Sequence, residues 1–73
     1  MPFKVIEEQI DGRLNVFIKL SQNVTFITKG KFIELFKSIP DGAEVHIDGG
    51  RTRFIDKDIL EIIHNYKDYH LVR

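Results

Sequence analysis

The first twenty residues alternate apolar and polar positions in two stretches, residues 3–10 and 13–20. Asp11-Gly12 separates them, and this dipeptide is typical of a two-residue type I′ turn between antiparallel strands. The pattern predicts a β-hairpin in which Ile10 faces Arg13. Six apolar side chains then share one face, as a half-buried sheet requires, namely Phe3, Val5, Leu14, Val16, Ile18 and Leu20. The opposite face carries Lys4, Ile6, Glu8, Asn15, Phe17 and Lys19.

After a polar stretch at residues 21–28, the apolar spacing becomes helical and predicts a helix over residues 29–38, with Thr28 as its N-cap. Alternation returns at residues 43–48, so we expect a strand there and a parallel crossover. Asp56 is placed to cap a second helix, and Leu71-Val72 begins a further element. The apolar stripe of the second helix consists of Ile59, Leu60, Ile62, Ile63 and Tyr66.

This order, β-β-α-β-α with a C-terminal stub, predicts an α/β fold with one domain over residues 1–73. Right-handed crossovers should place both helices on the apolar face of the hairpin, which gives a two-layer sandwich with a mixed sheet. The expected core consists of Val5, Val16, Ile18, Phe32, Phe36, Val45, Ile47, Leu60 and Ile63.

Composition narrows the class of protein. With 73 residues the chain is below the usual size of an enzyme domain, so we expect a binding or regulatory module without an active site. Eleven basic residues balance eleven acidic ones, which disfavours a nucleic-acid partner. Without cysteine there is neither a disulfide scaffold nor a zinc-thiolate cluster, which fits a cytoplasmic setting. No stretch approaches the about 20 apolar residues of a spanning helix, so we expect a soluble domain.

Candidate chemistry is sparse. His46 and Asp48 share one strand face, and His64 and His70 lie in or after the last helix, but no set of three or four convergent ligands is visible. We therefore predict no metal and no cofactor. The loop at residues 48–51 follows a strand end, where ligands of α/β sheets often bind. It lacks the Lys-Ser/Thr of a phosphate-binding loop, so a flexible turn is favoured over nucleotide or anion binding.

Residues 46–63, His-Ile-Asp-Gly-Gly-Arg-Thr-Arg-Phe-Ile-Asp-Lys-Asp-Ile-Leu-Glu-Ile-Ile, resemble the central strand, loop and helix of STAS domains. The resemblance is greatest to the STAS domain at the cytoplasmic C-terminus of bacterial SulP-type anion transporters. Residues 20–29 are similar to that family's Leu-Ser-x-x-Val-Ser-Phe-Leu-Asn-Lys stretch, and residues 39–42 match its turn before the strand. The similarity covers about residues 13–66 and implies a STAS-like fold with a regulatory or docking role.

Two departures from the family matter. STAS domains that antagonise anti-sigma factors carry Asp-Ser-Ser-Gly at the start of the second helix, with a phosphorylatable serine, whereas this chain reads Asp56-Lys57-Asp58-Ile59. We therefore expect no serine-phosphorylation switch there, and we expect Asp58 to fill the electrostatic role of a phosphate permanently. The later strands and helices of the family are missing, so we expect a shortened or C-terminally truncated STAS-like domain.

The resemblance implies a non-catalytic regulatory or docking domain of a SulP-like sulfate or anion transporter, at the cytoplasmic face of the inner membrane. The alternative is a free-standing STAS-like protein of the anti-sigma-factor-antagonist type, without a phosphorylatable serine. In both cases the partner is another protein. The candidate partner loop consists of Asp48, Gly49, Gly50, Arg51, Thr52, Asp56, Lys57 and Asp58.

A second candidate surface follows from the hairpin register. Ile6 and Phe17 face each other on the polar side of the hairpin, with Ile10 one diagonal step away. If the chain ends near Val72, we also expect an unpaired sheet edge beside the strand at residues 43–48. We therefore expect homodimerisation, or docking of a partner, through that edge together with the surface formed by Ile6, Ile10 and Phe17.

Overall fold

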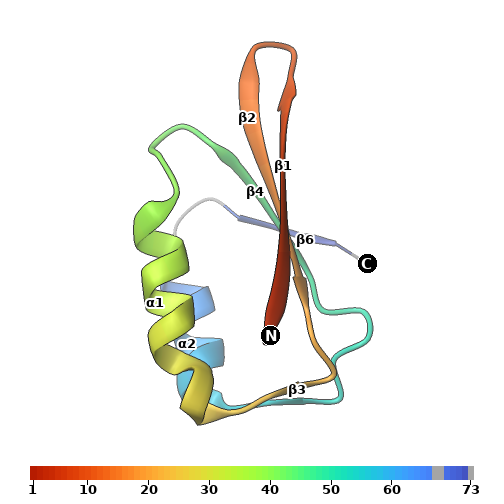
Figure 1. Cartoon of the computed structure of the whole chain (residues 1–73), viewed down its shortest axis with the longest axis vertical. Coiled ribbons are helices and arrows are strands. Elements are labelled where there is room, and N and C mark those ends of the chain that lie inside the picture. The colour runs from red at the N-terminus through yellow and green to blue at the C-terminus, as the bar shows by residue number, and fades with distance from the viewer. Residues whose placement is uncertain (67–68, 73) are drawn as a thin grey trace.

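A four-stranded mixed sheet forms one layer of the molecule and two helices form the other (Figure 1). The structure, a computed structural model, describes residues 1–66 and 69–72. The strand order is β1-β2-β4-β6, with β1 antiparallel to β2 and the other two pairs parallel. The main elements are β1 (Phe3–Ile10), β2 (Arg13–Leu20), α1 (Lys29–Ser38), β4 (Glu44–Asp48), α2 (Lys57–Asn65) and β6 (Tyr69–Val72). The α/β class, the order β-β-α-β-α and the two layers expected from the sequence are confirmed.

The hairpin has the register that its sequence predicts. Ile10 pairs with Arg13, Ile6 with Phe17 and Phe3 with Leu20. Asp11 and Gly12 both have positive φ angles, of 52° and 77°, as the two central positions of a type I′ turn require. The turn chemistry therefore determines which side chains of β1 and β2 face the helices.

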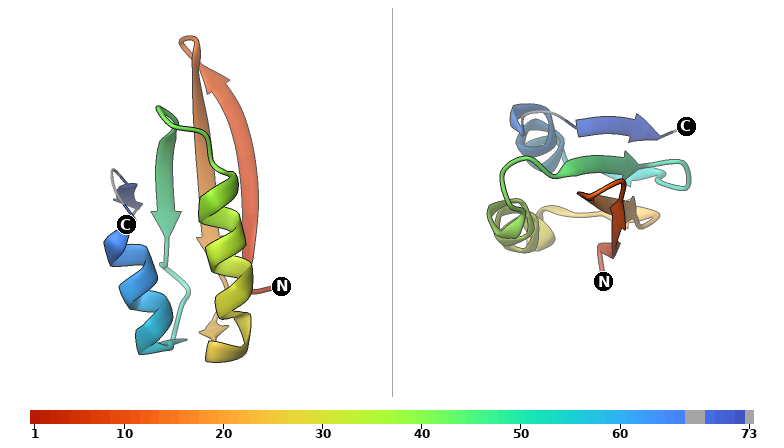
Figure 2. Two further views of the ribbon diagram at one scale, coloured as in Figure 1. Left: turned by 90° about the vertical axis from the view of Figure 1, so that its left-hand side faces the viewer. Right: turned by 90° about the horizontal axis from the view of Figure 1, so that it is seen from above.

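Both helices lie on the same face of the sheet (Figure 2). The two crossover connections, β2-α1-β4 and β4-α2-β6, run in the same direction along the strand order. Because parallel crossovers share the same handedness, both helices then lie on the same face of the sheet. A short 3-10 helix, η1 (Phe26–Thr28), precedes α1. The Thr28 hydroxyl donates to the Thr25 carbonyl, so the side-chain cap of α1 that the sequence predicts at Thr28 is not formed. The predicted cap of α2 is present, because Asp56 Oδ2 accepts from the Asp58 backbone N–H at 2.9 Å. No helix of the described residues is long and apolar enough to cross a membrane.

The core lies between the sheet and the helices. Phe32 is its largest fully buried side chain and meets the Phe3 ring edge-on, with 4.9 Å between ring centroids. Six of the nine residues expected in the core are buried. The nine buried apolar residues are Val16, Ile18, Leu20, Val24, Phe32, Val45, Ile47, Ile59 and Ile63.

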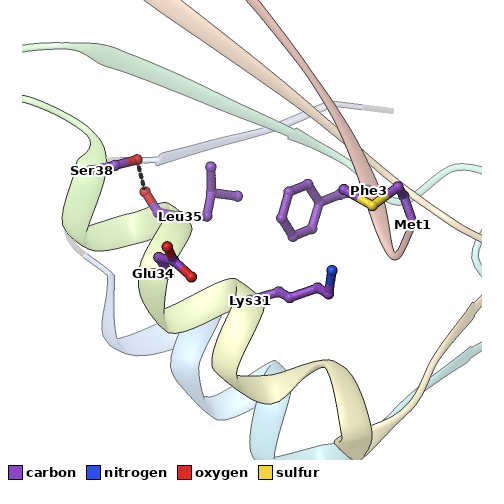
Figure 3. A pocket seen from close by; sticks show the side chains of 6 residues that line it. All are labelled: Met1, Phe3, Lys31, Glu34, Leu35 and Ser38. Carbon is purple, nitrogen blue, oxygen red and sulfur yellow. Dashed lines mark hydrogen bonds between the residues drawn. The ribbon is translucent and has the colours of Figure 1, made fainter.

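Three expected core residues are not fully buried. Val5 is 39% exposed, because β1 is an edge strand and α1 does not close over it. A pocket of about 330 Å³ lies beside the edge-on contact of Phe3 and is lined by Phe3 on β1 and Leu35 on α1 (Figure 3). Phe36 is half-buried and stacks on Tyr66, the C-cap residue of α2, with ring centroids 4.6 Å apart.

The third is Leu60, which is 40% exposed, whereas its neighbour Ile59 is fully buried. At about 100° per residue, Leu60 lies about 60° beyond Ile63, outside the arc that begins at Ile62 and faces the core. The apolar stripe of α2 is thus narrower than its sequence suggests.

The segment expected to be a polar connection contains an unpredicted strand. Asn23–Val24 form β3, which pairs in parallel with β5 (Phe54–Ile55) in a separate two-stranded sheet. Val24 is completely buried in consequence. Two-residue strands are too short to show an alternating pattern, so periodicity could not predict them.

The expectation of an unpaired edge beside β4 is wrong. Tyr69–Val72 form β6, which pairs with β4 from Val45 opposite Tyr69 to Asp48 opposite Val72. β4 is therefore an inner strand, and the outer strands of the sheet are β1 and β6.

The buried position of Ile47 leads to the first prediction. Replacement of Ile47 by Val should lower the free energy of unfolding by about 0.5–1.5 kcal/mol, and replacement by Ala by about 2–5 kcal/mol, enough to unfold much of so small a domain. Urea denaturation measures both. Ile6→Val, on an exposed side chain, is the control and should change little; an equal loss in that variant would contradict the assigned burial.

The cap of α2 leads to the second prediction. Asp56→Ala removes the acceptor of the Asp58 N–H and should cost about 1 kcal/mol of stability. The exposed Asp41, whose side chain caps no helix, provides the control variant Asp41→Ala. Thermal unfolding of the two variants should therefore differ, and identical midpoints would show that the cap contributes nothing.

Candidate functional site

The sheet face opposite the helices carries one row of side chains that crosses all four strands. Ile6 on β1 lies opposite Phe17 on β2, Phe17 opposite His46 on β4, and His46 opposite His70 on β6. This row is a direct result of the registers, because paired positions on neighbouring strands point to the same side. We call the sheet surface around this row the open face.

Three of the four side chains in the row are stacked rings. The rings of Phe17 and His46 are nearly parallel, at 11°, with centroids 4.5 Å apart. His46 and His70 follow at 5.3 Å and 27°. Stacked rings add to the stability that burial alone provides, so these contacts help to hold the three side chains in place. Ile6, at its end, is 63% exposed.

A hydrogen-bond network holds the histidines from the side of the hairpin turn. Asn15 is the one buried polar side chain of the described residues; its Nδ2 donates to the Arg13 carbonyl and its Oδ1 accepts from His46 Nε2 at 2.9 Å. The Asn15 oxygen only accepts, so the His46 hydrogen resides on Nε2. His46 therefore has a defined orientation against Phe17.

Glu44 links the outer strand to the hairpin. One carboxylate oxygen accepts from His70 Nε2, and the other lies 2.6 Å from Arg13 Nη1. The hydrogen bond from His70 is the largest cause that lowers the pKa of Glu44 from its ordinary value of 4.5; desolvation opposes this shift, and the positive charge of Arg13 reinforces it. Glu44 is thus the acceptor that ties β6 and β2 to β4.

A pocket of about 440 Å³ lies along the row, lined in part by Ile6, Phe17 and His46. Its apolar part comes from Ile6, Phe17 and Val72, and its charged rim from Lys4, Lys19 and Asp48. Lys4 and Lys19 are directly paired across the hairpin, and like charges in that arrangement repel. The open face therefore combines an apolar centre with a charged rim.

The predicted partner loop begins at the edge of this pocket. Asp48 Oδ1 accepts from the Gly50 N–H at 2.9 Å, and the Thr52 hydroxyl donates to the Ser21 carbonyl at 2.9 Å. Arg53 N–H donates to the Gln22 carbonyl, so the loop is fastened to the chain that follows β2. These hydrogen bonds connect the loop to the segment after β2.

The side chains of that loop fall into two groups. Arg51 and Lys57 are exposed cations. Asp56 caps α2, and Asp58 is an exposed carboxylate in the first turn of that helix. Since Asp48 belongs both to the pocket and to the loop, the open face and the first half of the loop are continuous. The second half, with Asp56, Lys57 and Asp58, lies at the start of α2.

The sequence prediction located part of this site. It placed Ile6 opposite Phe17, and both are there; Ile10 lies on the same side of β1, beside the hairpin turn. It did not include Glu44 and Arg13, which meet because β2 pairs with β4, and it considered His70 only as a metal ligand, whereas the pairing of β6 with β4 brings His70 to Glu44. His64 is elsewhere, with Nδ1 3.4 Å from the Tyr69 hydroxyl.

No group of three or more His, Asp or Glu side chains that could hold a metal ion occurs within residues 1–66 and 69–72. Comparison of the chain with protein-family models, with curated proteins and with solved structures found no match in any of the three.

The lowered pKa of Glu44 leads to the third prediction. A carboxyl group whose pKa is lower in the folded than in the unfolded state stabilises the folded state at pH values above its unfolded-state pKa. That contribution is lost as the pH falls through the folded-state pKa. The free energy of unfolding should therefore decrease as the pH falls below 4.5, and Glu44→Gln should remove part of that decrease. Urea unfolding at a series of pH values between about 3 and 6 measures the slope. Glu8→Gln, an exposed glutamate with no ion pair among the described residues, is the control. The same loss of slope in both variants would refute a specific role of Glu44.

Proposed function

We propose that the chain is a non-catalytic regulatory or docking domain of the STAS type that serves a SulP-like anion transporter. The similarity of residues 13–66 to the STAS domains of those transporters supports this assignment. The strand and helix order, with both helices on one face of a mixed sheet, agrees with it. Fold alone does not define a function, so the proposal depends on a surface that a partner would recognise.

The observation that carries the proposal is the open face. An apolar centre formed by Ile6, Phe17 and Val72, with a rim of Lys and Asp side chains, has the anatomy of a protein interface. The aromatic stack beneath it is held by hydrogen bonds, so a partner would meet a surface that is already ordered. The membrane-spanning part of a transporter is the partner that we propose for this face.

The loop at residues 48–58 supplies a second contact in this proposal. Arg51 is exposed and lines a second pocket, which shares Lys4 and Lys19 with that of the open face. The start of α2 carries the fixed negative charge of Asp58. A carboxylate in the first turn of a helix is favoured by the helix dipole. The docking interaction thus needs no added phosphate at α2, because the charge is already present.

The fourth prediction tests the open face directly. Ile6→Glu places a charge in the apolar centre and should strongly reduce anion uptake by proteoliposomes that hold the transporter with this domain, because docking is lost. Ile6 is a cleaner position than Phe17, whose ring supports His46. The exposed Ile33, on α1, is the matched control: Ile33→Glu should retain uptake.

Two results would contradict the proposal. Uptake by Ile6→Glu equal to that of the parent would exclude the open face as the docking surface. A coding sequence upstream of residue 1 without about a dozen apolar spans of roughly 20 residues each would exclude the transporter. The free-standing STAS-like protein would then be the better assignment.

A further inference from the structure

The net charge of zero conceals a separation of charge along the 35 Å long axis of the molecule. The hairpin turn and the connection from α1 to β4 lie at one end, the upper one in Figure 1. Residues 7–13 and 40–44 form it and carry five acidic residues and one basic residue, a net charge of −4. The opposite end, formed by residues 21–31 and 49–58, carries five basic and two acidic residues, a net charge of +3. We call the latter the basic end.

The basic end also exposes large apolar side chains. Phe26 is 67% exposed, Ile27 79% and Phe54 52%. Phe26 and Ile27 belong to η1, and Phe54 to β5, which pairs with β3 directly before η1. These elements lie together at the lower end of the molecule, next to the start of both helices (Figures 1 and 2). None of the three side chains belongs to the open face or lines its pocket.

The basic residues surround these apolar side chains in the sequence. Lys29 follows Ile27 after one residue, Arg53 directly precedes Phe54, and Lys57, three residues after Phe54, is the first residue of α2. All three basic side chains are exposed, and none forms an ion pair among the described residues. One acidic side chain of this end, Asp56, is already engaged in a cap. The positive charge at the basic end is therefore available to an external anion.

We propose that the basic end binds the surface of a membrane that contains anionic lipid. Phe26, Ile27 and Phe54 would enter the boundary between headgroups and acyl chains, while Lys29, Arg53 and Lys57 meet the lipid phosphates. Apolar side chains flanked by Lys and Arg are the combination that interfacial membrane binding uses. The acidic end then points away from the bilayer, so the charge separation orients the whole domain.

Charge and side-chain chemistry favour a bilayer over other occupants of this end. A second copy bound through its own basic end would bring two net charges of +3 together, which repel. Single-stranded nucleic acid is bound by aromatic stacking, but the most exposed apolar side chain here is the aliphatic Ile27. An aliphatic side chain gains most from contact with hydrocarbon.

The fifth prediction concerns vesicle binding by the 73-residue chain. The chain should cosediment with vesicles of phosphatidylcholine and phosphatidylglycerol mixed at about seven to three, and several-fold less with vesicles of phosphatidylcholine alone or at high salt. Ile27→Ser should weaken the partition coefficient roughly tenfold, because one aliphatic side chain no longer enters the bilayer. Lys29→Gln should weaken binding to the anionic vesicles only.

Ile6→Ser is the matched control, since Ile6 is similarly exposed but lies on the open face. It should bind vesicles as the parent does, and thermal unfolding should show that both serine variants remain folded. Absence of binding at low salt, or equal weakening by Ile6→Ser and Ile27→Ser, would overturn the proposal. A concentration-dependent dimer that Ile27→Ser abolishes would also overturn it. The same holds if a single-stranded oligonucleotide displaces the protein from anionic vesicles but leaves its binding to phosphatidylcholine vesicles unchanged. The proposal is independent of transport, because Ile6→Glu tests the open face and Ile27→Ser tests the basic end.

Discussion

The parallel pairing of β2 with β4 determines both layers of this protein. Ile18 lies opposite Ile47 on the side of the helices, and both are buried almost completely. Because side chains alternate along a strand, the adjacent positions Phe17 and His46 must then face the other side, where they stack. A shift of one residue in this pairing would expose the core and bury the ring stack. The hydrophobic contact that stabilises the fold therefore also positions the candidate docking surface.

The candidate docking surface is available because the helices cover only one face of the sheet. Both crossovers place their helices on the same face, so nothing in the described chain packs over the open face (Figure 2). The protein compensates with a ring stack and with hydrogen bonds, in which Glu44 accepts from His70 and Arg13, and Asn15 from His46. An uncovered sheet that keeps its side chains ordered in this way loses little conformational entropy when a partner binds.

Local signals made most of the fold predictable from the sequence. Asp11-Gly12 determined the hairpin register, and helical spacing with Asp56 as a cap located both helices. Features that depend on distant contacts were not predictable in this way: Val24 is buried where β3 meets β5, and Val5 is 39% exposed because α1 packs on Phe3 but does not close over Val5. The same limit applies to the site. The pair of Ile6 and Phe17 within one hairpin could be predicted, whereas the contact of Glu44 with His70 required the position of β6.

Net charge also proved a poor guide to the surface, for a reason of scale. Electrostatic attraction in a physiological salt solution decays over about 8–10 Å, which is several-fold shorter than the 35 Å axis that separates the acidic and basic ends. A large anionic surface next to the basic end would therefore interact with a local charge of +3 and hardly with the compensating charge at the far end. A balanced composition excludes a uniformly cationic surface. It still allows the charges to be separated, so that the basic end attracts an anionic surface. The exposed side chains of Phe26, Ile27 and Phe54 occupy that same end, so the electrostatic and the hydrophobic contributions to binding add in one orientation.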